Sequence, residues 1–399
     1  MNQQAIVDRP DREDRAARAC IDAAAKLLRG GKSDVPDDFV ALLFGRAAPE
    51  DLVGYEAAEL AVLAREAWAF VATRKAGAPK IRLEQPKASD GEHLKSISVI
   101  EIVNDDMPFL VDSVMAELTE RGLAPRLVVH PILAVARDKV GRLTTAPSEA
   151  GRNKDEVRES FIHVHVARIE DVARLAAIVH GLEQVLTEVR RCVQDWRPMI
   201  RRINEVIQDL KSNPPPVPVD DIAEAIQFLE WVAADNFTLL GVRDYTLSGK
   251  ERDLKPMLET GLGVLRGGDV PVLTRGGEVV SITPQLRAFF DEPKTLIVTK
   301  ANAKSRVHRR VYLDYIGVKR FDADGNPSGE FRIVGLFTST VYIRSIRSIP
   351  FLRRKVDAVL TRAGFNPETH SGKALVNVLE TYPATSCSRS TRIRSIISH

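Results

Sequence analysis

The sequence predicts an α+β fold in which a helical N-terminal region is followed by two modules that combine a sheet with helices. Apolar residues recur at helical spacing through most of the first 75 residues. The next stretch has the order strand, helix, strand, strand, helix, which suggests a split βαβ layer. The run NPPPVP at 213–218 is typical of a stiff linker and divides the chain.

The N-terminal region, residues 1–83, is expected to form a helical cap. A helix over 14–29 carries an apolar stripe and ends at two glycines. A short helix is expected over 37–44. A longer one is expected over 48–76, because acidic residues occupy its first turn, where the helix dipole favours them.

The first module, residues 84–212, begins with a run of β-branched residues typical of a strand that is buried on both faces. Its expected elements are strands at 97–103, 127–138 and 161–169, a helix that starts near Pro108, and helices at 171–189 and 196–211. The last strand of a βαββαβ unit is not evident in the sequence. The boundary of this module is therefore open.

The loop between the first strand and its helix is the candidate ligand site. Asn104, Asp105 and Asp106 end the strand, and Pro108 suits the first helical turn because it lacks a backbone donor. Free N–H groups at a helix start favour an anion, whereas the carboxylates favour a cation. An amino acid carries both charges. The alternative, which the local pattern alone favours, is that the acids only cap the helix and meet water.

The second module, residues 220–383, follows the linker at 213–219 and is expected to be a mixed sheet with helices. Its expected elements are helices at 220–234, 282–291 and 349–363 and strands at 237–247, 294–301, 308–321 and 331–342. We expect its plan to be related to that of the first module, although no strict sequence repeat is present.

Composition excludes several classes of protein. With 57 Lys and Arg against 54 Asp and Glu, the formal net charge of +3 gives no electrostatic case for nucleic acid. No apolar run is long enough to span a bilayer, and the first residues lack the apolar core of a signal peptide. Three cysteines without metal or disulfide spacing suit a reducing cytosol, so a cytoplasmic protein is expected.

No motif predicts a cofactor or a metal in this chain. The nearest match to a dinucleotide-binding turn, residues 261–267, lacks the third glycine and does not lead into a helix. His163 and His165 lie two apart on one strand, so their rings point the same way. They could hold zinc, but a third ligand has no candidate. Histidines on the wetter face of a sheet are the favoured interpretation, and His130 is interpreted as a hydrogen-bonded core residue.

Several long segments resemble, in the same order, the large bacterial NAD-specific glutamate dehydrogenases. They are RKAGAPKIRL at 74–83, NDDMPFLVDSV at 104–114, ESFIHVHVARI at 159–169, FLEWVAADNFTLLGVRDY at 228–245, VHRRVYLDYIGVKRFDADG at 307–325, GEFRIVGLFTSTVYIRS at 329–345 and HSGKALVNVLETYP at 370–383. In that family this region lies upstream of the catalytic part. The resemblance implies ACT-type modules, which are small βαββαβ units that often bind amino acids at their interfaces and regulate a linked enzyme.

The resemblance places Asn104, Asp105, Asp106, Pro108 and Phe109 in the strand-to-helix loop where ACT modules take ligands. It implies that the intact protein uses NAD to oxidise L-glutamate to 2-oxoglutarate and ammonium. The family's catalytic lysine and dinucleotide fold match nothing here, so we expect no catalytic residue and no cofactor in this chain, which alone should be inactive.

The expected partners are further copies of the chain, assembled through the ACT-like modules, and an amino-acid effector; nucleic acid and membrane are not expected. Two alternatives stay open. The chain could be a free-standing amino-acid-binding module, or a purely structural segment for oligomerisation.

The tail at 384–399, ATSCSRSTRIRSIISH, departs abruptly from the resemblance and is expected not to fold natively, because it lacks helical periodicity. One choice of its codons, read with a single C restored in front, encodes RDELFQIDADPLYHFA, which resembles the family's continuation. We therefore infer a frameshifted or truncated gene. Sequencing across the codon of Pro383 tests this inference, which fails if the bases cannot encode the restored string.

Overall fold

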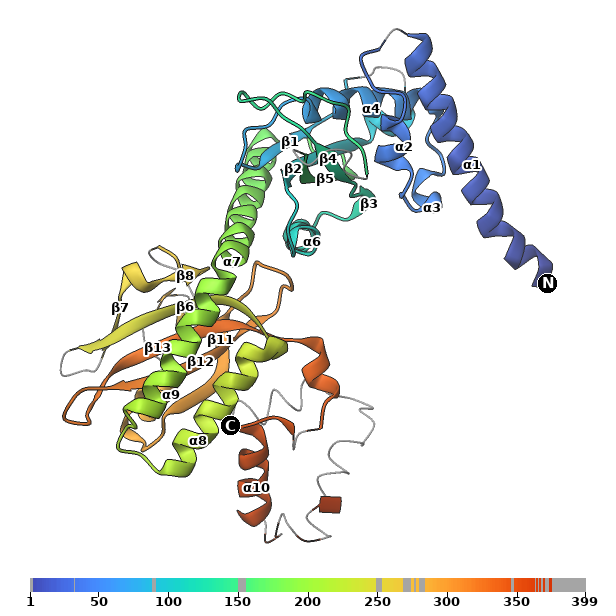
Figure 1. Ribbon diagram of the computed structural model, residues 1–399. Helices are drawn as coiled ribbons and strands as arrows, with labels where there is room; N and C mark the ends of the chain where they lie inside the picture. The colour runs from blue at the N-terminus through green and yellow to red at the C-terminus, as the bar shows by residue number, and fades with distance from the viewer. Residues whose placement is uncertain are drawn as a thin grey trace. The chain divides into compact units, whose positions relative to one another are not determined.

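The structure is a computed structural model that divides into two compact units, Met1–Val189 and Arg190–His399, each of which is described by itself (Figure 1). It describes residues 3–31, 33–87, 91–149, 156–248, 253–267, 274–275, 278–279, 284–345 and 348–362, together with a few single positions between 364 and 374. The tail at 384–399 lies outside the described residues. Within the described parts, no helix is both long and apolar enough to cross a membrane.

The first unit combines helices with one sheet. Its helices are α1 (Gln3–Gly30), α2 (Phe39–Phe44), α3 (Pro49–Leu52), α4 (Ala57–Val71), α5 (Glu92–Lys95), α6 (Leu110–Glu120) and the first part of α7 (Val172–Ser212). Its strands are β1 (Lys80–Glu84), β2 (Ile97–Asp105), β3 (Pro125–Val129), β4 (Ile132–Val135) and β5 (Val157–Ala167).

The strands form an antiparallel sheet in the order β1-β2-β5-β3, with β4 also paired to β5. The segment β2-α6-β3 is a split βαβ unit, because β5 lies between its two strands. In a βαββαβ unit the last strand would pair with the first, on the outer side of β2. Here β1 occupies that position. The edge strand that a βαββαβ unit would have after its last helix is therefore replaced by a strand that precedes β2 in the sequence. Residues 80–83, which the sequence assigned to the helical cap, belong to the sheet.

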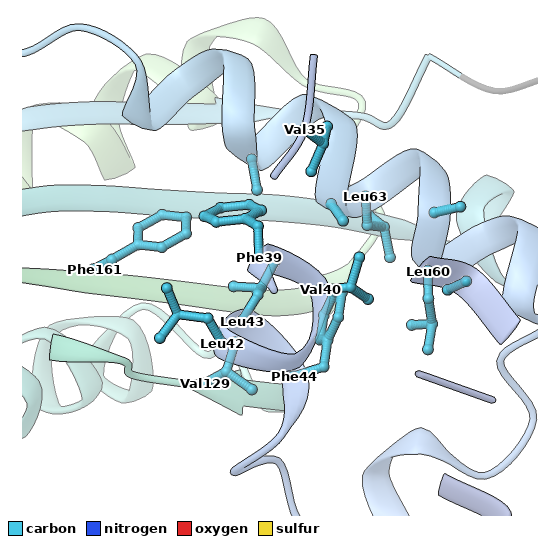
Figure 2. Packing of buried hydrophobic residues seen from close by; sticks show 14 of the residues in the cluster. Val35, Phe39, Val40, Leu42, Leu43, Phe44, Leu60, Leu63, Val129 and Phe161 are labelled. Carbon is cyan, nitrogen blue, oxygen red and sulfur yellow. The ribbon is translucent and has the colours of Figure 1, made fainter. Parts of the chain in front are cut away.

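The helical cap and the sheet share one core. Phe39 and Phe44 of α2 and Leu60 and Leu63 of α4 pack in the same apolar cluster as Phe161 of β5 (Figure 2). The cap therefore covers one face of the sheet. Every residue of β2 up to its last is buried, as predicted for a strand covered on both faces.

Two predicted elements of this unit are each divided. The helix expected over 48–76 is interrupted between α3 and α4, where Gly54 has a φ of +97°, a conformation that glycine adopts readily. The strand expected over 127–138 is split into β3 and β4. Pro131 lies between them and has no N–H to donate to a ladder.

The two helices expected at 171–189 and 196–211 form a single helix, α7, with Pro198 inside it. A proline removes one hydrogen bond from a helix interior, and for this reason two separate helices were predicted. However, Cys192, Met199 and Ile203 are buried on either side of the proline. We attribute the continuity of the helix to this unbroken apolar face.

The second unit contains the remainder of α7 and a second sheet. Its helices and helical turns are α8 (Val219–Trp231), η1 (Val232–Asn236), η2 (Leu258–Thr260), α9 (Pro284–Asp291), η3 (Ser339–Ile343) and α10 (Leu352–Arg362). Its strands are β6 (Phe237–Ser248), β7 (Asp253–Pro256), β8 (Leu262–Gly263), β9 (Thr274–Arg275), β10 (Glu278–Val279), β11 (Leu296–Lys304), β12 (Tyr312–Phe321) and β13 (Pro327–Phe337).

This sheet has the order β11-β12-β13-β6-β7, and β8 also pairs with β6. The described pairings are all antiparallel, so the expectation of a mixed sheet was wrong. The strands β11, β12 and β13 pair in chain order, because short turns such as the one at Gly325 (φ +81°) return each strand beside the last. This order differs from the βαββαβ plan that was expected to repeat.

The two faces of the second sheet differ in character. One face packs against apolar residues of α7, α8 and α10. The other face carries Arg332, whose Nε donates to Glu330 Oε1 at 3.2 Å and whose guanidinium lies 3.8 Å from the centre of the Tyr245 ring. The Tyr315 hydroxyl donates to the same carboxylate. Arg332, Glu330 and Tyr315 are all buried, so this sheet encloses a charged pair.

Candidate functional site

Of the predicted site residues, Asn104 and Asp105 are the last two residues of β2, where they pair with Ser160 and Glu159 of β5, so the prediction that the strand stops before them was wrong. Asp106, Pro108 and Phe109 lie in the loop between β2 and α6. Asn104 is buried, and its Nδ2 donates to the backbone oxygen of Asp105 at 2.9 Å. Asp106 and Pro108 are exposed, and Phe109 is half-buried. The loop therefore joins a buried strand end to a surface segment.

The helix α6 begins at Leu110, so the prediction that Pro108 occupies its first turn was wrong. Phe109 has a φ of +71° and a ψ of 0°, in the left-handed region that non-glycine residues rarely adopt. A residue in this conformation cannot continue a right-handed helix. Both the backbone N–H and the hydroxyl of Ser113 donate to the oxygen of Phe109, at 3.1 and 2.6 Å, and fix this start.

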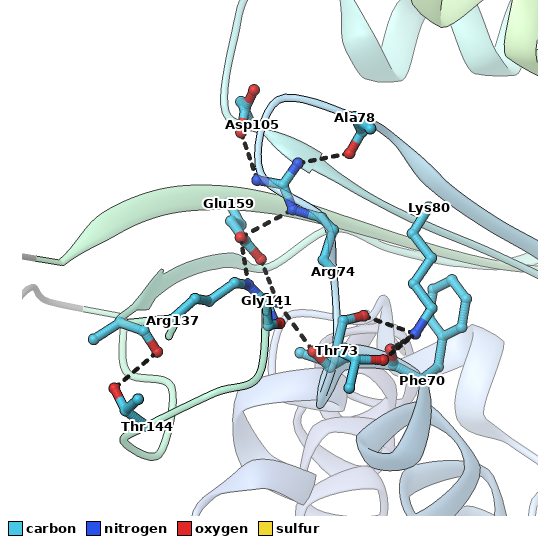
Figure 3. A network of polar contacts seen from close by, with 12 residues as sticks. Phe70, Thr73, Arg74, Ala78, Lys80, Asp105, Arg137, Gly141, Thr144 and Glu159 are labelled. Carbon is cyan, nitrogen blue, oxygen red and sulfur yellow. Dashed lines mark hydrogen bonds and ion pairs between the residues drawn. The ribbon is translucent and has the colours of Figure 1, made fainter. Parts of the chain in front are cut away.

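Asp105 is held by an arginine of the same chain. The Nη2 of Arg74, which follows α4, lies 2.5 Å from Asp105 Oδ1 (Figure 3). The same guanidinium donates to Glu159 Oε1 at 3.0 Å and to the backbone oxygen of Ala78 at 2.9 Å. The Arg74 side chain is only 3% exposed. A ligand's ammonium would have to displace a buried arginine to reach Asp105.

A second arginine completes this network on Glu159 of β5. The Nε and Nη2 of Arg137 each lie 2.7 Å from a carboxylate oxygen of Glu159, which is fully buried (Figure 3). Arg137 also donates to the backbone oxygens of Val71 and Gly141. Two carboxylates thus balance two arginines. The sequence interpretation missed this cluster. An acidic residue within an apolar strand could have indicated it, because a buried charge needs a partner.

The prediction that His163 and His165 lie on a wetter face of the sheet was wrong, because both are buried under the helical cap. Their Nε2 atoms are 2.8 Å apart and hydrogen-bonded to each other. In the residues that the structure describes, no group of three or more side chains is arranged to hold a metal. His130 bonds Ser160 Oγ at 2.7 Å, as predicted, but it is half-buried and does not lie in the core.

Comparison with known proteins identifies the family. Residues 39–182 match the family model described as the glutamate dehydrogenase ACT1 domain, and residues 349–386 match the glutamate dehydrogenase helical motif 1. Over 87% of its length, the chain is 35% identical to the NAD-specific glutamate dehydrogenase of Halomonas elongata. The chain belongs to the NAD-specific glutamate dehydrogenase family.

Two further glutamate dehydrogenases support this assignment. The chain is 31% identical to the NAD-specific enzyme of Pseudomonas aeruginosa over 86% of its length, and 27% identical to that of Mycobacterium tuberculosis over 71%. It covers 22%, 21% and 16% of the three relatives in turn. The chain therefore spans about a fifth of the length of the glutamate dehydrogenases it matches.

The match to the ACT1 domain covers more than the split βαβ unit. It begins at Phe39, where α2 starts, and therefore includes α2, α3, α4 and β1 as well as the loop at 104–109. These helices share their core with the sheet. The ACT1 domain thus consists of a sheet together with the helices that cover one of its faces.

Asp106 of the β2–α6 loop pairs with an exposed arginine, whereas Asp105 pairs with a buried one. The Oδ2 of Asp106 is 3.2 Å from Arg158 Nε, and the two side chains are 29% and 66% exposed. Burial lowers the pKa of the nearby His130, and the negative charge of Asp106 opposes that shift. An exposed ion pair contributes only about 0–1 kcal/mol, so a ligand can exchange with Arg158 at little cost.

Proposed function

We propose that this chain forms a regulatory and assembly region of an NAD-specific glutamate dehydrogenase, and that the β2–α6 loop binds an amino-acid effector. The observation that carries the proposal is the ACT1 match over a split βαβ sheet whose strand-to-helix loop presents the exposed carboxylate of Asp106. The intact protein would convert L-glutamate, water and NAD⁺ into 2-oxoglutarate, ammonium and NADH. The controlling region would act on that reaction from outside the site of hydride transfer.

The loop offers a partner for each charge of an amino acid. The effector's ammonium would take the place of Arg158 on Asp106, because that ion pair is exposed and exchangeable. The released guanidinium can then pair with the effector's carboxylate. The start of α6, where Phe109 makes no side-chain cap, adds N–H groups that favour an anion. Asp105 keeps the loop in place through Arg74.

We expect Asp106→Asn to weaken effector binding by about tenfold or more, because it removes the charge that attracts the ammonium. Isothermal titration calorimetry of the full chain with each common L-amino acid measures this change. Asp22→Asn, which removes an exposed carboxylate on α1, is the matched control and should bind as the unaltered chain does. Absence of heat with every amino acid, or equal affinity in the Asp106→Asn variant, would contradict an effector site here.

We expect the purified chain to form no NADH from L-glutamate and NAD⁺ above the buffer background. The reason is that the resemblance assigns the catalytic lysine and the dinucleotide fold to a part of the family that matches nothing in this sequence. Absorbance of NADH at saturating glutamate measures the rate. Turnover that scales with the concentration of the chain would show that hydride transfer takes place here.

A purely structural role in assembly is the second candidate. One observation favours it: Asp105 and Asp106 both pair with arginines of the same chain, which leaves the loop neutralised without any ligand. Sedimentation separates the candidates. A stable oligomer that binds no amino acid supports assembly alone, whereas a monomer that binds one supports a free-standing binding module.

A further inference from the structure

A continuous chain of hydrogen bonds runs through the interior of the first unit. Tyr55 Oη lies 2.7 Å from His165 Nδ1, and His165 Nε2 lies 2.8 Å from His163 Nε2. His163 Nδ1 lies 3.1 Å from Glu101 Oε1. Tyr55 comes from the connection between α3 and α4, the histidines from β5, and Glu101 from β2, so this Tyr55–Glu101 chain links the helical cap to the sheet.

Glu101 fixes one end of the Tyr55–Glu101 chain as an acceptor. Arg82 of β1 donates its Nε to Glu101 Oε2 at 2.7 Å, and its Nη2 donates to the backbone oxygen of Glu66. Burial raises the pKa of Glu101. The hydrogen bond from His163 and the charges of His163 and Arg82 together lower that pKa by more than burial raises it, so the net shift is downward. The carboxylate is therefore ionised and can only accept hydrogen bonds.

Because Glu101 only accepts, the hydrogens of the uncharged chain have one consistent arrangement. His163 must carry its hydrogen on Nδ1 to donate to Glu101, which leaves its Nε2 as an acceptor. His165 must then donate from Nε2, so its Nδ1 accepts from the hydroxyl of Tyr55. Burial, and to a smaller extent Glu59, raises the pKa of Tyr55 to about 12, so its hydroxyl keeps its proton.

One added proton gives a second consistent arrangement. If it enters at Tyr55, the hydroxyl hydrogen passes to His165 Nδ1, and the hydrogen on His165 Nε2 passes to His163 Nε2. His163 is then a cation beside the Glu101 carboxylate, while His165 is neutral with its hydrogen on Nδ1. A second proton is excluded, because it would place two N–H groups against each other across 2.8 Å.

We propose that His163 and His165 form a one-proton switch that couples proton uptake to the contact between the helical cap and the sheet. Uptake of a single proton reverses the bonds from His163 to His165 and from His165 to Tyr55, and leaves the bond to Glu101 unchanged. Tyr55 changes from a donor to an acceptor, so its hydroxyl hydrogen must turn to another acceptor. The bond that ties the connection between α3 and α4 to the sheet thereby reverses its direction.

The charged and titratable groups around the switch agree with this placement of the charge. His93 of α5 lies with its ring centre 4.7 Å from that of Tyr55. Burial, then His163 and then His93, lower the pKa of His165 well below its ordinary value, so His165 itself stays neutral. The other groups that act on the Tyr55 end are Glu59 of α4, Asp51 of α3 and Arg126 of β3.

The switch predicts how stability depends on pH. Because folding lowers the pKa of His165, the unfolded chain binds more protons than the folded chain below the ordinary value of 6.5. This part of the stability is therefore fully present above pH 6.5 and is lost as the pH falls. We expect amide protection in α2 and α4 to decrease over the same interval, since these helices are held to the sheet beside Tyr55.

Nitrogen-15 NMR of the full chain labelled at histidine tests the proposal. At neutral pH we expect the Nδ1–H tautomer for His163 and the Nε2–H tautomer for His165. On acidification, His163 should become charged and His165 should change to the Nδ1–H tautomer with one shared midpoint. Two separate midpoints, or a His165 that keeps its hydrogen on Nε2, would overturn the switch.

Substitutions identify the signals and separate the switch from a merely structural pair. His163→Gln and His165→Gln assign the resonances, and His180→Gln, an exposed histidine on α7, should leave the shared midpoint unchanged. Tyr55→Phe removes the acceptor at the end of the chain, so the tautomer change of His165 should disappear. If Tyr55→Phe retains the shared midpoint and the tautomer change, the proposal is wrong. If that variant does not fold, the NMR titration of the unaltered chain decides whether the switch exists.

Discussion

Glu159→Gln is expected to lower the free energy of unfolding of the first unit by about 3–5 kcal/mol, the cost of leaving buried charges without their partner. Glu159 is the carboxylate that the guanidiniums of Arg74 and Arg137 share in Figure 3, and the two arginine side chains are 3% and 8% exposed. Glutamine keeps the shape of the glutamate side chain but places a neutral amide beside the two arginine cations. Hydrogen exchange of amides in β2 and β5, measured against denaturant, gives this free energy.

Glu170→Gln is the matched control for this prediction, because Glu170 also pairs with an arginine, Arg168, but is exposed. Its effect should stay within about 0.5 kcal/mol. The loss caused by Glu159→Gln should also persist at high salt, since buried charges are screened little. A change below about 1 kcal/mol would mean that the two arginines find sufficient compensation elsewhere.

Arg332→Met is expected to destabilise the second unit by a similar amount, about 3–5 kcal/mol. Glu330 is fully buried, and its Oε1 accepts from Arg332 and from the Tyr315 hydroxyl. Without the guanidinium, the buried Oε1 of Glu330 accepts only from the neutral hydroxyl of Tyr315. Burial alone would lower the pKa of Arg332, but Tyr315 and Glu330 raise it, so the guanidinium is charged in the folded protein. Hydrogen exchange of amides in β12 and β13 reports the loss.

The double variant Glu330→Gln with Arg332→Met separates the value of the pair from the cost of breaking it. Removing both charges takes away the desolvation penalty as well as the attraction, so the double variant should be more stable than Arg332→Met alone. A double variant that loses the sum of the two single effects would show that Glu330 and Arg332 act independently.

The elements that the sequence predicts well are those with a dense apolar pattern. β2 was predictable, because a run of β-branched residues buried on both faces has few other uses. β1 was not, because its sequence KIRLE carries three charged residues and most of it is half-buried at a sheet edge. The interior of α7 was misinterpreted, since Pro198 suggested a break that tertiary packing overrides.

The position of the candidate site was predictable, but its electrostatics were not. Three polar residues at the end of a buried strand locate the β2–α6 loop whatever their partners are. The pairing of Asp105 with Arg74 joins residues 31 positions apart, and nothing in either local pattern distinguishes it from two solvated charges. The same holds for His163 and His165, whose alternation indicates a shared face but not what covers it. Long-range pairing of charges is set by the fold.

The origin of β1 also affects how the sheet is completed on the ribosome. The partner of the outer edge of β2 is translated just before β2 itself, so this antiparallel pair can close while β5 is still being made. Had the edge strand followed α7, a nascent chain would have carried an unpaired β2 edge throughout the synthesis of that long helix, available to neighbouring polypeptides. The upstream strand therefore shields the growing protein from edge-to-edge association at the stage when it is most vulnerable.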